Sequence, residues 1–64
     1  MCESTVYVLK GEKRSMFMKD VAKIDVCGKN FFCQDILGEG KILEGVVLAG
    51  INLVGHEIIF ENAR

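Results

Sequence analysis

The 64-residue chain contains no proline and no long hydrophobic run, and only eight of its residues are lysine or arginine. Its longest uncharged stretch, residues 45–55, is much shorter than the roughly 20 apolar residues of a transmembrane helix, so we expect no membrane span. The basic residues are scattered among nine acidic ones, and the net charge is −1. Because nucleic-acid binding depends on clustered basic side chains, this distribution argues against it.

Basic residues are also missing from the first positions. Cys2 and Glu3 stand where a signal peptide would have its basic segment. We therefore expect a cytoplasmic protein. Cysteine is scarce and odd in number, with Cys2, Cys27 and Cys33 as its three occurrences, so a disulfide framework is not expected. Five residues separate Cys27 from Cys33, more than the about two to four of a zinc knuckle.

The chain is small but rich in apolar residues, which make up 50% of it and give a mean hydropathy of +0.28. A single domain of this length, here residues 1–64, buries only about 60% of its unfolded surface. The remaining apolar surface predicts association, most simply as a symmetric homodimer. The sequence has no nucleophile–base pair, phosphate-binding glycine loop or paired carboxylates at a suitable spacing, which indicates that it is not an enzyme.

Short β-branched and aromatic runs alternate with glycines, a pattern typical of an all-β protein. We expect strands over residues 5–9, 15–18, 20–27, 30–36 and 57–61, and a longer one over 41–53 that bends at Gly45 and Gly50. Tight turns are predicted at Gly11-Glu12 (type II′), Gly28-Lys29 and Gly55-His56, with a wider loop over 38–40. Six or seven short strands favour an SH3-like or similar small barrel, because closure or pairing across a dimer removes exposed edges.

Alternation within the predicted strands indicates which side chains face the core. Ile24 and Val26 are expected to face inward, as are Ile58 and Phe60 in the last strand.

Two other pairs depend on strand register. Phe31 and Phe32 are adjacent and face opposite sides of a strand, which favours a core role over a platform for stacking RNA bases. Cys27 and Cys33 point to opposite faces if the turn between them has two residues, and share a face if it has three.

The clearest candidate for chemistry is Met1-Cys2. The Met1 amine, the Cys2 amide nitrogen and the Cys2 thiolate can together chelate one metal ion. If Met1 is removed, amine and thiolate lie on the same residue. Nitrogen and thiolate donors suit late divalent metals, and a deprotonated amide with a thiolate favours square-planar Ni(II) or Cu(II) over zinc. In a two-fold dimer, two copies of Cys2 could share one ion.

Two further residues are candidate outer ligands. Glu3 is the carboxylate nearest to Cys2, although a solvated surface charge is the simpler explanation for it. His56 is the only histidine, and imidazole is a common metal ligand. Its place after Gly55 also fits an exposed turn residue.

Four segments together resemble the CooT family: residues 1–7 (MCESTVY), 20–24 (DVAKI), 35–39 (DILGE) and 50–61 (GINLVGHEIIFE). This family comprises small cytoplasmic proteins whose namesake is a nickel-binding accessory factor for carbon monoxide dehydrogenase maturation. The resemblance implies a homodimer in which Cys2 binds nickel. It does not extend to Cys27 or Cys33. Family members are often labelled as predicted RNA-binding proteins, a role that the charge balance here does not favour.

The sequence therefore predicts a nickel-binding accessory protein, or metallochaperone, that holds or delivers Ni(II) to a nickel enzyme or its maturation machinery. An alternative is an RNA-binding small barrel of Sm-like or SH3-like type. A third hypothesis is a structural adaptor dimer that binds no metal and in which Cys2 has no special role.

Overall fold

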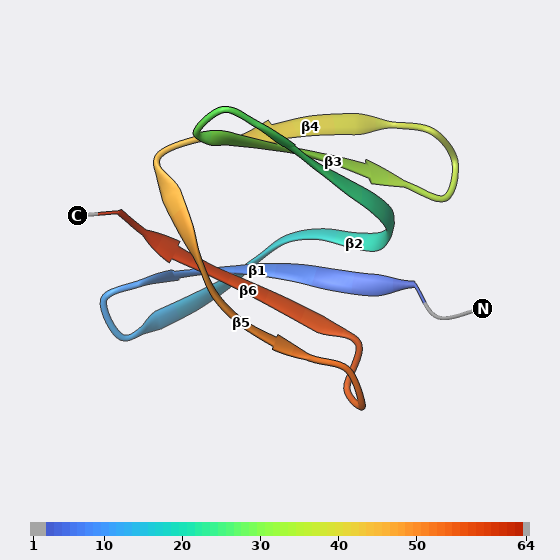
Figure 1. Cartoon of the computed structure of the whole chain (residues 1–64). Coiled ribbons are helices and arrows are strands. Elements are labelled where there is room, and N and C mark those ends of the chain that lie inside the picture. The colour runs from blue at the N-terminus through green and yellow to red at the C-terminus, as the bar shows by residue number, and fades with distance from the viewer. Residues whose placement is uncertain (1–2, 64) are drawn as a thin grey trace.

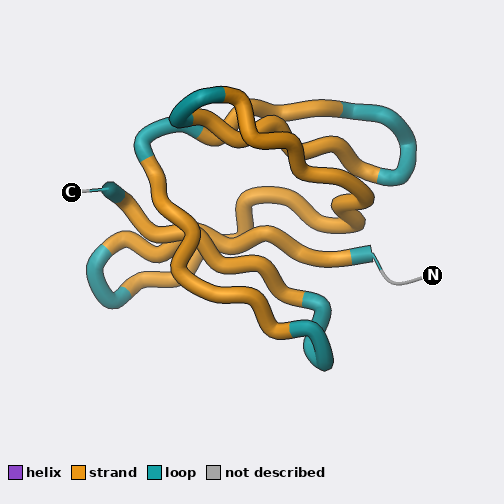
Figure 2. Tube along the Cα trace, viewed as in Figure 1, coloured by secondary structure: helices purple, strands orange, loops and turns teal. Residues whose placement is uncertain are grey.

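The computed structural model describes residues 3–63, which form six β-strands and no helix (Figures 1 and 2). The strands are β1 (Ser4–Lys10), β2 (Lys13–Cys27), β3 (Asn30–Asp35), β4 (Gly40–Leu43), β5 (Val46–Asn52) and β6 (Glu57–Asn62). No helix in this part of the chain is long and apolar enough to cross a membrane. The predicted all-β class is therefore confirmed.

The six strands form one sheet in the order β4-β3-β2-β1-β6-β5. Neighbours pair antiparallel except β1 and β6, which are parallel and join the two ends of the chain. Figure 1 shows the sheet curling, so that β3 and β4 lie across from β5 and β6. Within residues 3–63 the edge strands β4 and β5 do not pair, so the expected barrel stays open.

Two-residue turns connect β1 to β2 and β2 to β3, as the glycine positions predict. Lys10 pairs with Lys13 across the first turn, and Cys27 with Asn30 across the second. Gly11 has a φ of +64°, a left-handed conformation that glycine adopts without steric cost. A positive φ confined to the first central residue fits the predicted type II′ turn.

Two predicted strand boundaries differ from the structure. Residues 15–18 and 20–27 belong to one long strand, β2, which bends at Asp20 where φ is +57°. The bend lets the first part of β2 pair mainly with β1 and the second part with β3. Conversely, the predicted strand over 41–53 divides into β4 and β5 at Gly45, and its register shifts near Gly50, so both predicted bends are confirmed.

A small core lies on the concave side of the sheet. Its buried members come from every strand: Val6, Val8, Met18, Val21, Cys33, Leu43, Val46 and Phe60. Ile24 and Ile58 are half-buried and pack against this core. Val26 was expected to face inward, but 70% of it is exposed because the open sheet leaves that end of β2 uncovered.

Candidate metal centre

The candidate ligands Met1 and Cys2 lie outside the described residues. The described residues that come next in the chain are Glu3 and the start of β1, so the residues around this point are considered first. Glu3 immediately precedes this strand, and its side chain is half-buried. On one side of the strand, Thr5 pairs in parallel with Glu57 at the beginning of β6. Residues that lead into β6 therefore lie beside those that lead into β1.

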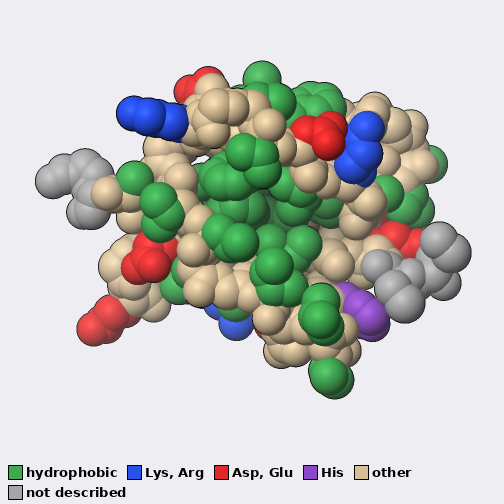
Figure 3. All heavy atoms as spheres, in the orientation of Figure 1, with side chains coloured by type: hydrophobic (Ala, Val, Ile, Leu, Met, Phe, Trp, Pro, Cys, Tyr) green, Lys and Arg blue, Asp and Glu red, His purple; other side chains and the backbone are tan. Residues whose placement is uncertain are grey.

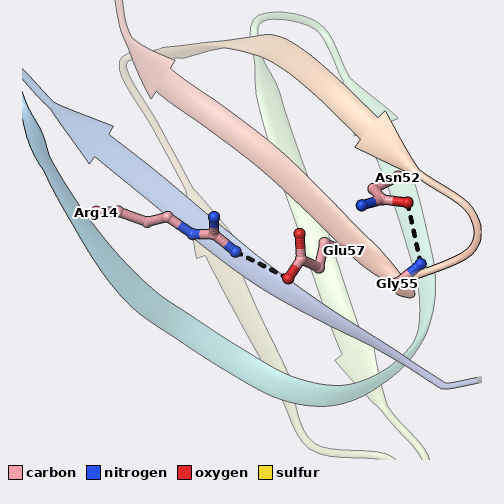
Figure 4. Close-up of polar contacts among 4 residues, drawn as sticks. All are labelled: Arg14, Asn52, Gly55 and Glu57. Atoms are coloured by element: carbon pink, nitrogen blue, oxygen red, sulfur yellow. Dashed lines mark hydrogen bonds and ion pairs between the residues drawn. The ribbon is translucent and has the colours of Figure 1, made fainter.

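His56 is the last residue before β6 and lies at this junction. Its backbone carbonyl accepts a hydrogen bond from the Thr5 amide at 2.9 Å. The turn over residues 53–56 is closed by Asn52, whose side-chain Oδ1 accepts the Gly55 amide at 3.0 Å (Figure 4). The left-handed residue is His56, with φ of +56°, so the predicted tight turn at Gly55-His56 is wrong in its detail.

A hollow adjoins His56 and the first residue of β1. Its lining combines polar and aliphatic side chains from three segments: Ser4, Ile51, Asn52, Leu53, His56, Glu57 and Ile58. The exposed imidazole of His56 can therefore be approached from solvent. The sequence signal for this arrangement is Asn52 three residues before Gly55, a spacing that suits side-chain closure of a turn.

Glu57 follows His56 but is engaged elsewhere. Its Oε2 atom lies 2.9 Å from Nη2 of Arg14, which belongs to β2 on the other side of β1 (Figure 4). The Arg14 guanidinium also lies 4.0 Å from the centre of the Tyr7 ring, a cation–π arrangement. This cross-strand cluster engages the Glu57 carboxylate in an ion pair, whereas the neighbouring imidazole of His56 is exposed to solvent.

The two described thiols differ in environment. Cys27 is exposed at the end of β2, whereas Cys33 is completely buried in β3. The two-residue turn thus directs them to opposite faces, one of the two alternatives predicted. Burial raises the pKa of the Cys33 thiol and keeps it protonated. No group of three His, Cys, Asp or Glu side chains within residues 3–63 could hold a metal ion.

Phe31 and Phe32 do not form a shared stacking platform. The Phe31 ring packs against Phe60 of the core, with centroids 4.7 Å apart and planes inclined by 47°. Phe32 lies on the other face of β3, where its ring covers Gly40 of the neighbouring strand. The expected core role is confirmed for Phe31, whereas Phe32 packs outside the core against Gly40.

Apolar side chains gather where the sheet fails to close (Figure 3). We call this surface the apolar seam; it is lined by Ile24, Val26, Phe31, Leu48, Ile51, Ile58 and Phe60. Half or more of Val26, Leu48 and Ile51 is exposed. The seam shares Ile51 and Ile58 with the hollow beside His56, so the two features are continuous.

Comparisons with known proteins identify the family of the chain and agree with its fold. The sequence model of the family described as "CO dehydrogenase accessory protein CooT" matches residues 1–61. A crystal structure assigned to CooT from Carboxydothermus hydrogenoformans has the same fold, with a TM-score of 0.85 and 24% identity over 95% of this chain and 97% of that one. No curated protein matches the sequence. Since the family model spans nearly the whole sequence, the chain belongs to the CooT family of carbon monoxide dehydrogenase accessory proteins.

Proposed function

We propose that this protein is a nickel-binding accessory protein, which holds Ni(II) or delivers it during maturation of a nickel enzyme such as carbon monoxide dehydrogenase. The family match carries the proposal, because it begins at residue 1 and includes Cys2. The Cys2 thiolate is the principal ligand. The Met1 amine and the Cys2 amide supply nitrogen donors, a set that suits a late divalent metal.

The described surroundings fit this donor set. Glu3 and His56 are a carboxylate and an imidazole close to the start of β1, and both are suitable as additional donors. The other two thiols do not compete within the same site. Cys33 is buried, and Cys27 is the last residue of β2, beyond Val21, the residue that pairs with Ser4.

We further propose that the apolar seam is the homodimer interface. Its lining is entirely apolar, and the adjacent edge strand β5 has no charged residue, so water exposure of this surface is unfavourable. A two-fold contact would cover the same seam on both copies. Because the seam shares Ile51 and Ile58 with the hollow beside Ser4, such a dimer would bring the start of β1 in each copy towards one interface, and we expect one nickel ion per dimer.

The direct test is nickel titration of tag-free wild-type protein and a Cys2→Ser variant, followed by absorption spectroscopy and native mass spectrometry. We expect a thiolate-to-nickel charge-transfer band that saturates at one ion per dimer and disappears in the variant. Binding should weaken on acidification, because protons compete for the thiolate and the amine. Cys27→Ser is the matched control and should bind as wild type does. Equally tight binding by Cys2→Ser would contradict the proposal.

A further inference from the structure

We propose that the end of the molecule that bears the start of β1 is a docking surface for the enzyme under maturation, and that this enzyme presents an apolar recess rimmed by lysine or arginine. The surface consists of residues 36–39 in the β3–β4 loop, residues 53–56 in the β5–β6 turn and the start of β1 between them; we call it the loop end. The inference rests on the proposed function, because it names the surface through which this accessory protein contacts the enzyme that it supplies.

Strand pairing brings the two loops to the same end of the sheet. Ser4 at the start of β1 pairs with Val21 after the bend in β2, and Val21 pairs with Asp35 at the end of β3. On the other side of β1, the Thr5 amide donates a hydrogen bond to the His56 carbonyl at 2.9 Å. The start of β1 therefore lies between the two loops, and Figure 1 shows both of them on the side of the molecule where the chain begins.

The loop end carries the most exposed large apolar side chains of the described residues. Val54 is 93% exposed, Leu37 85% and Leu53 80%, and Ile36 beside Leu37 is 53% exposed. Exposed apolar side chains that gather on one part of a surface mark interaction sites. The lining of the apolar seam includes none of these four residues, so the loop end is separate from the proposed dimer interface.

Hydrogen bonds hold both loops in the conformation that exposes these side chains. Asp35 Oδ1 accepts the amides of Leu37 and Glu39 at 3.0 and 2.9 Å, and Asn52 Oδ1 accepts the amide of Gly55 at 3.0 Å. A loop that is already ordered loses less conformational entropy when it binds. Both loops therefore present their apolar side chains in a form that is ready to contact a partner.

The charge of the loop end indicates the chemistry of that partner. Apart from the Glu57–Arg14 ion pair, the charged residues of the segments that meet there are Glu3, Lys19, Asp20, Asp35 and Glu39. Four of these five are acidic, so a complementary surface carries positive charge around an apolar centre. A second copy of the chain would place carboxylates against carboxylates, and an anionic lipid surface would repel them as well. The charge therefore favours a basic protein surface.

The test measures binding of purified, nickel-free carbon monoxide dehydrogenase to the immobilised full-length protein by biolayer interferometry. We expect Leu37→Ser and Val54→Ser each to weaken binding at least about tenfold, because the lost side chains fill the apolar recess. Asp20→Asn combined with Glu39→Gln should slow association and make it less sensitive to salt. Met16→Ser is the matched control, since this side chain is 59% exposed in β2 outside the loop end, and it should bind as wild type does.

Wild-type protein that does not bind the enzyme, or loop variants that bind it as tightly as wild type, would overturn the docking surface. Loss of the homodimer in Leu37→Ser or Val54→Ser, measured by light scattering, would do the same, because a second copy would then cover the loop end. Sedimentation of wild type with phosphatidylserine vesicles, abolished in these variants, would identify a lipid surface instead.

Nickel titration of the same proteins separates this inference from the proposed function. The loop variants should retain wild-type nickel affinity, because their substitutions lie outside the proposed donor set. Failure of docking with intact nickel binding would therefore overturn the docking surface and leave the proposed function standing. Binding of the enzyme that depends on Leu37 and Val54 would support the docking surface even if Cys2→Ser bound nickel as tightly as wild type, a result that contradicts the proposed function.

Discussion

At the scale of single residues, the burial of Cys33 makes the stability of the protein depend on pH. Its side chain is inaccessible to solvent and its pKa is raised by burial, so the native state retains the thiol proton at a pH where the unfolded chain releases it. The unfolded state then binds fewer protons than the native state. The free energy of unfolding must therefore decrease as the pH rises through this window.

We predict that the contribution of Cys33 to stability is fully present below pH 9, the ordinary value for this thiol, and is lost as the pH rises above it. Urea unfolding between pH 7 and 10.5, under reducing conditions, measures the effect. Cys33→Ala should show a shallower alkaline decrease than the wild type. The exposed Cys27 provides the control: Cys27→Ala should follow the wild-type curve. Parallel curves for wild type and Cys33→Ala would refute the prediction.

Individual residues also show which features of the structure local sequence patterns can predict. The opposite orientations of Cys27 and Cys33 were predictable once the turn between them was limited to two residues. The position of His56 was not predictable in the same way. Its turn looks like an ordinary glycine-containing connection, and only the pairing of β1 with β6 shows that it adjoins the amino-terminal segment.

At the scale of elements, the β3–β4 connection combines a hydrogen-bonded loop with a close packing contact. Asp35 accepts hydrogen bonds from the amides of Leu37 and Glu39 at 3.0 and 2.9 Å, which orders the loop. At the start of β4, Gly40 lies beneath the Phe32 ring, and a Cβ atom placed there would be 2.3 Å from Cζ of that ring. The close approach of these two strands therefore depends on a missing side chain.

We predict that Gly40→Ala lowers the free energy of unfolding by about 1 to 3 kcal/mol, the usual range for overpacking, because the Phe32 ring must move. Gly50→Ala is the matched control, since a Cβ atom there meets nothing within 4 Å and φ is not left-handed. That control should be neutral or slightly stabilising. Chemical denaturation measures both variants, and equal stability of Gly40→Ala and wild type would show that Phe32 adapts without cost.

The elements also show why one strand boundary was missed. Two exposed residues, Lys19 and Asp20, interrupt the alternation, which suggested a break between two strands, and Asp20 adopts a left-handed backbone that the pattern does not encode. Both predicted strands are present, but they continue into each other through the bend at Asp20 and form the single strand β2. By contrast, the breaks near Gly45 and Gly50 were predictable, because glycine itself signals them.

At the scale of the whole molecule, the open sheet defines the expected association surface. We predict that Val26→Asp or Leu48→Asp on the apolar seam converts a homodimer to monomers, since each would bury an unpaired charge. Light scattering after size exclusion measures the mass, and circular dichroism checks the fold. Leu37→Asp, at an exposed loop outside the seam, should leave the dimer intact. Unchanged dimers in both seam variants would place the interface elsewhere.

At this scale, the fold class and the family were predictable from the sequence, whereas the closure of the sheet was not. Glycine turns and alternation predicted an all-β chain of six or seven short strands, and the structure has six with two boundaries placed differently. The resemblance to the CooT family is confirmed by the family match, as is a role as an accessory protein rather than an enzyme. Barrel closure was not predictable, because local patterns specify strands but not which edges meet. β4 and β5 are consecutive in the chain, yet they form opposite edges of the described sheet.

The parallel pairing of β1 with β6 has a consequence for synthesis. The ribosome releases the cysteine-bearing segment and β1 first, and β6 last. A nascent chain therefore exposes one edge of β1 until β6 has been made, and pairing between segments so distant in sequence is slow to form. The sheet can be completed only after translation of β6, so the fold belongs to the finished protein and not to the growing chain.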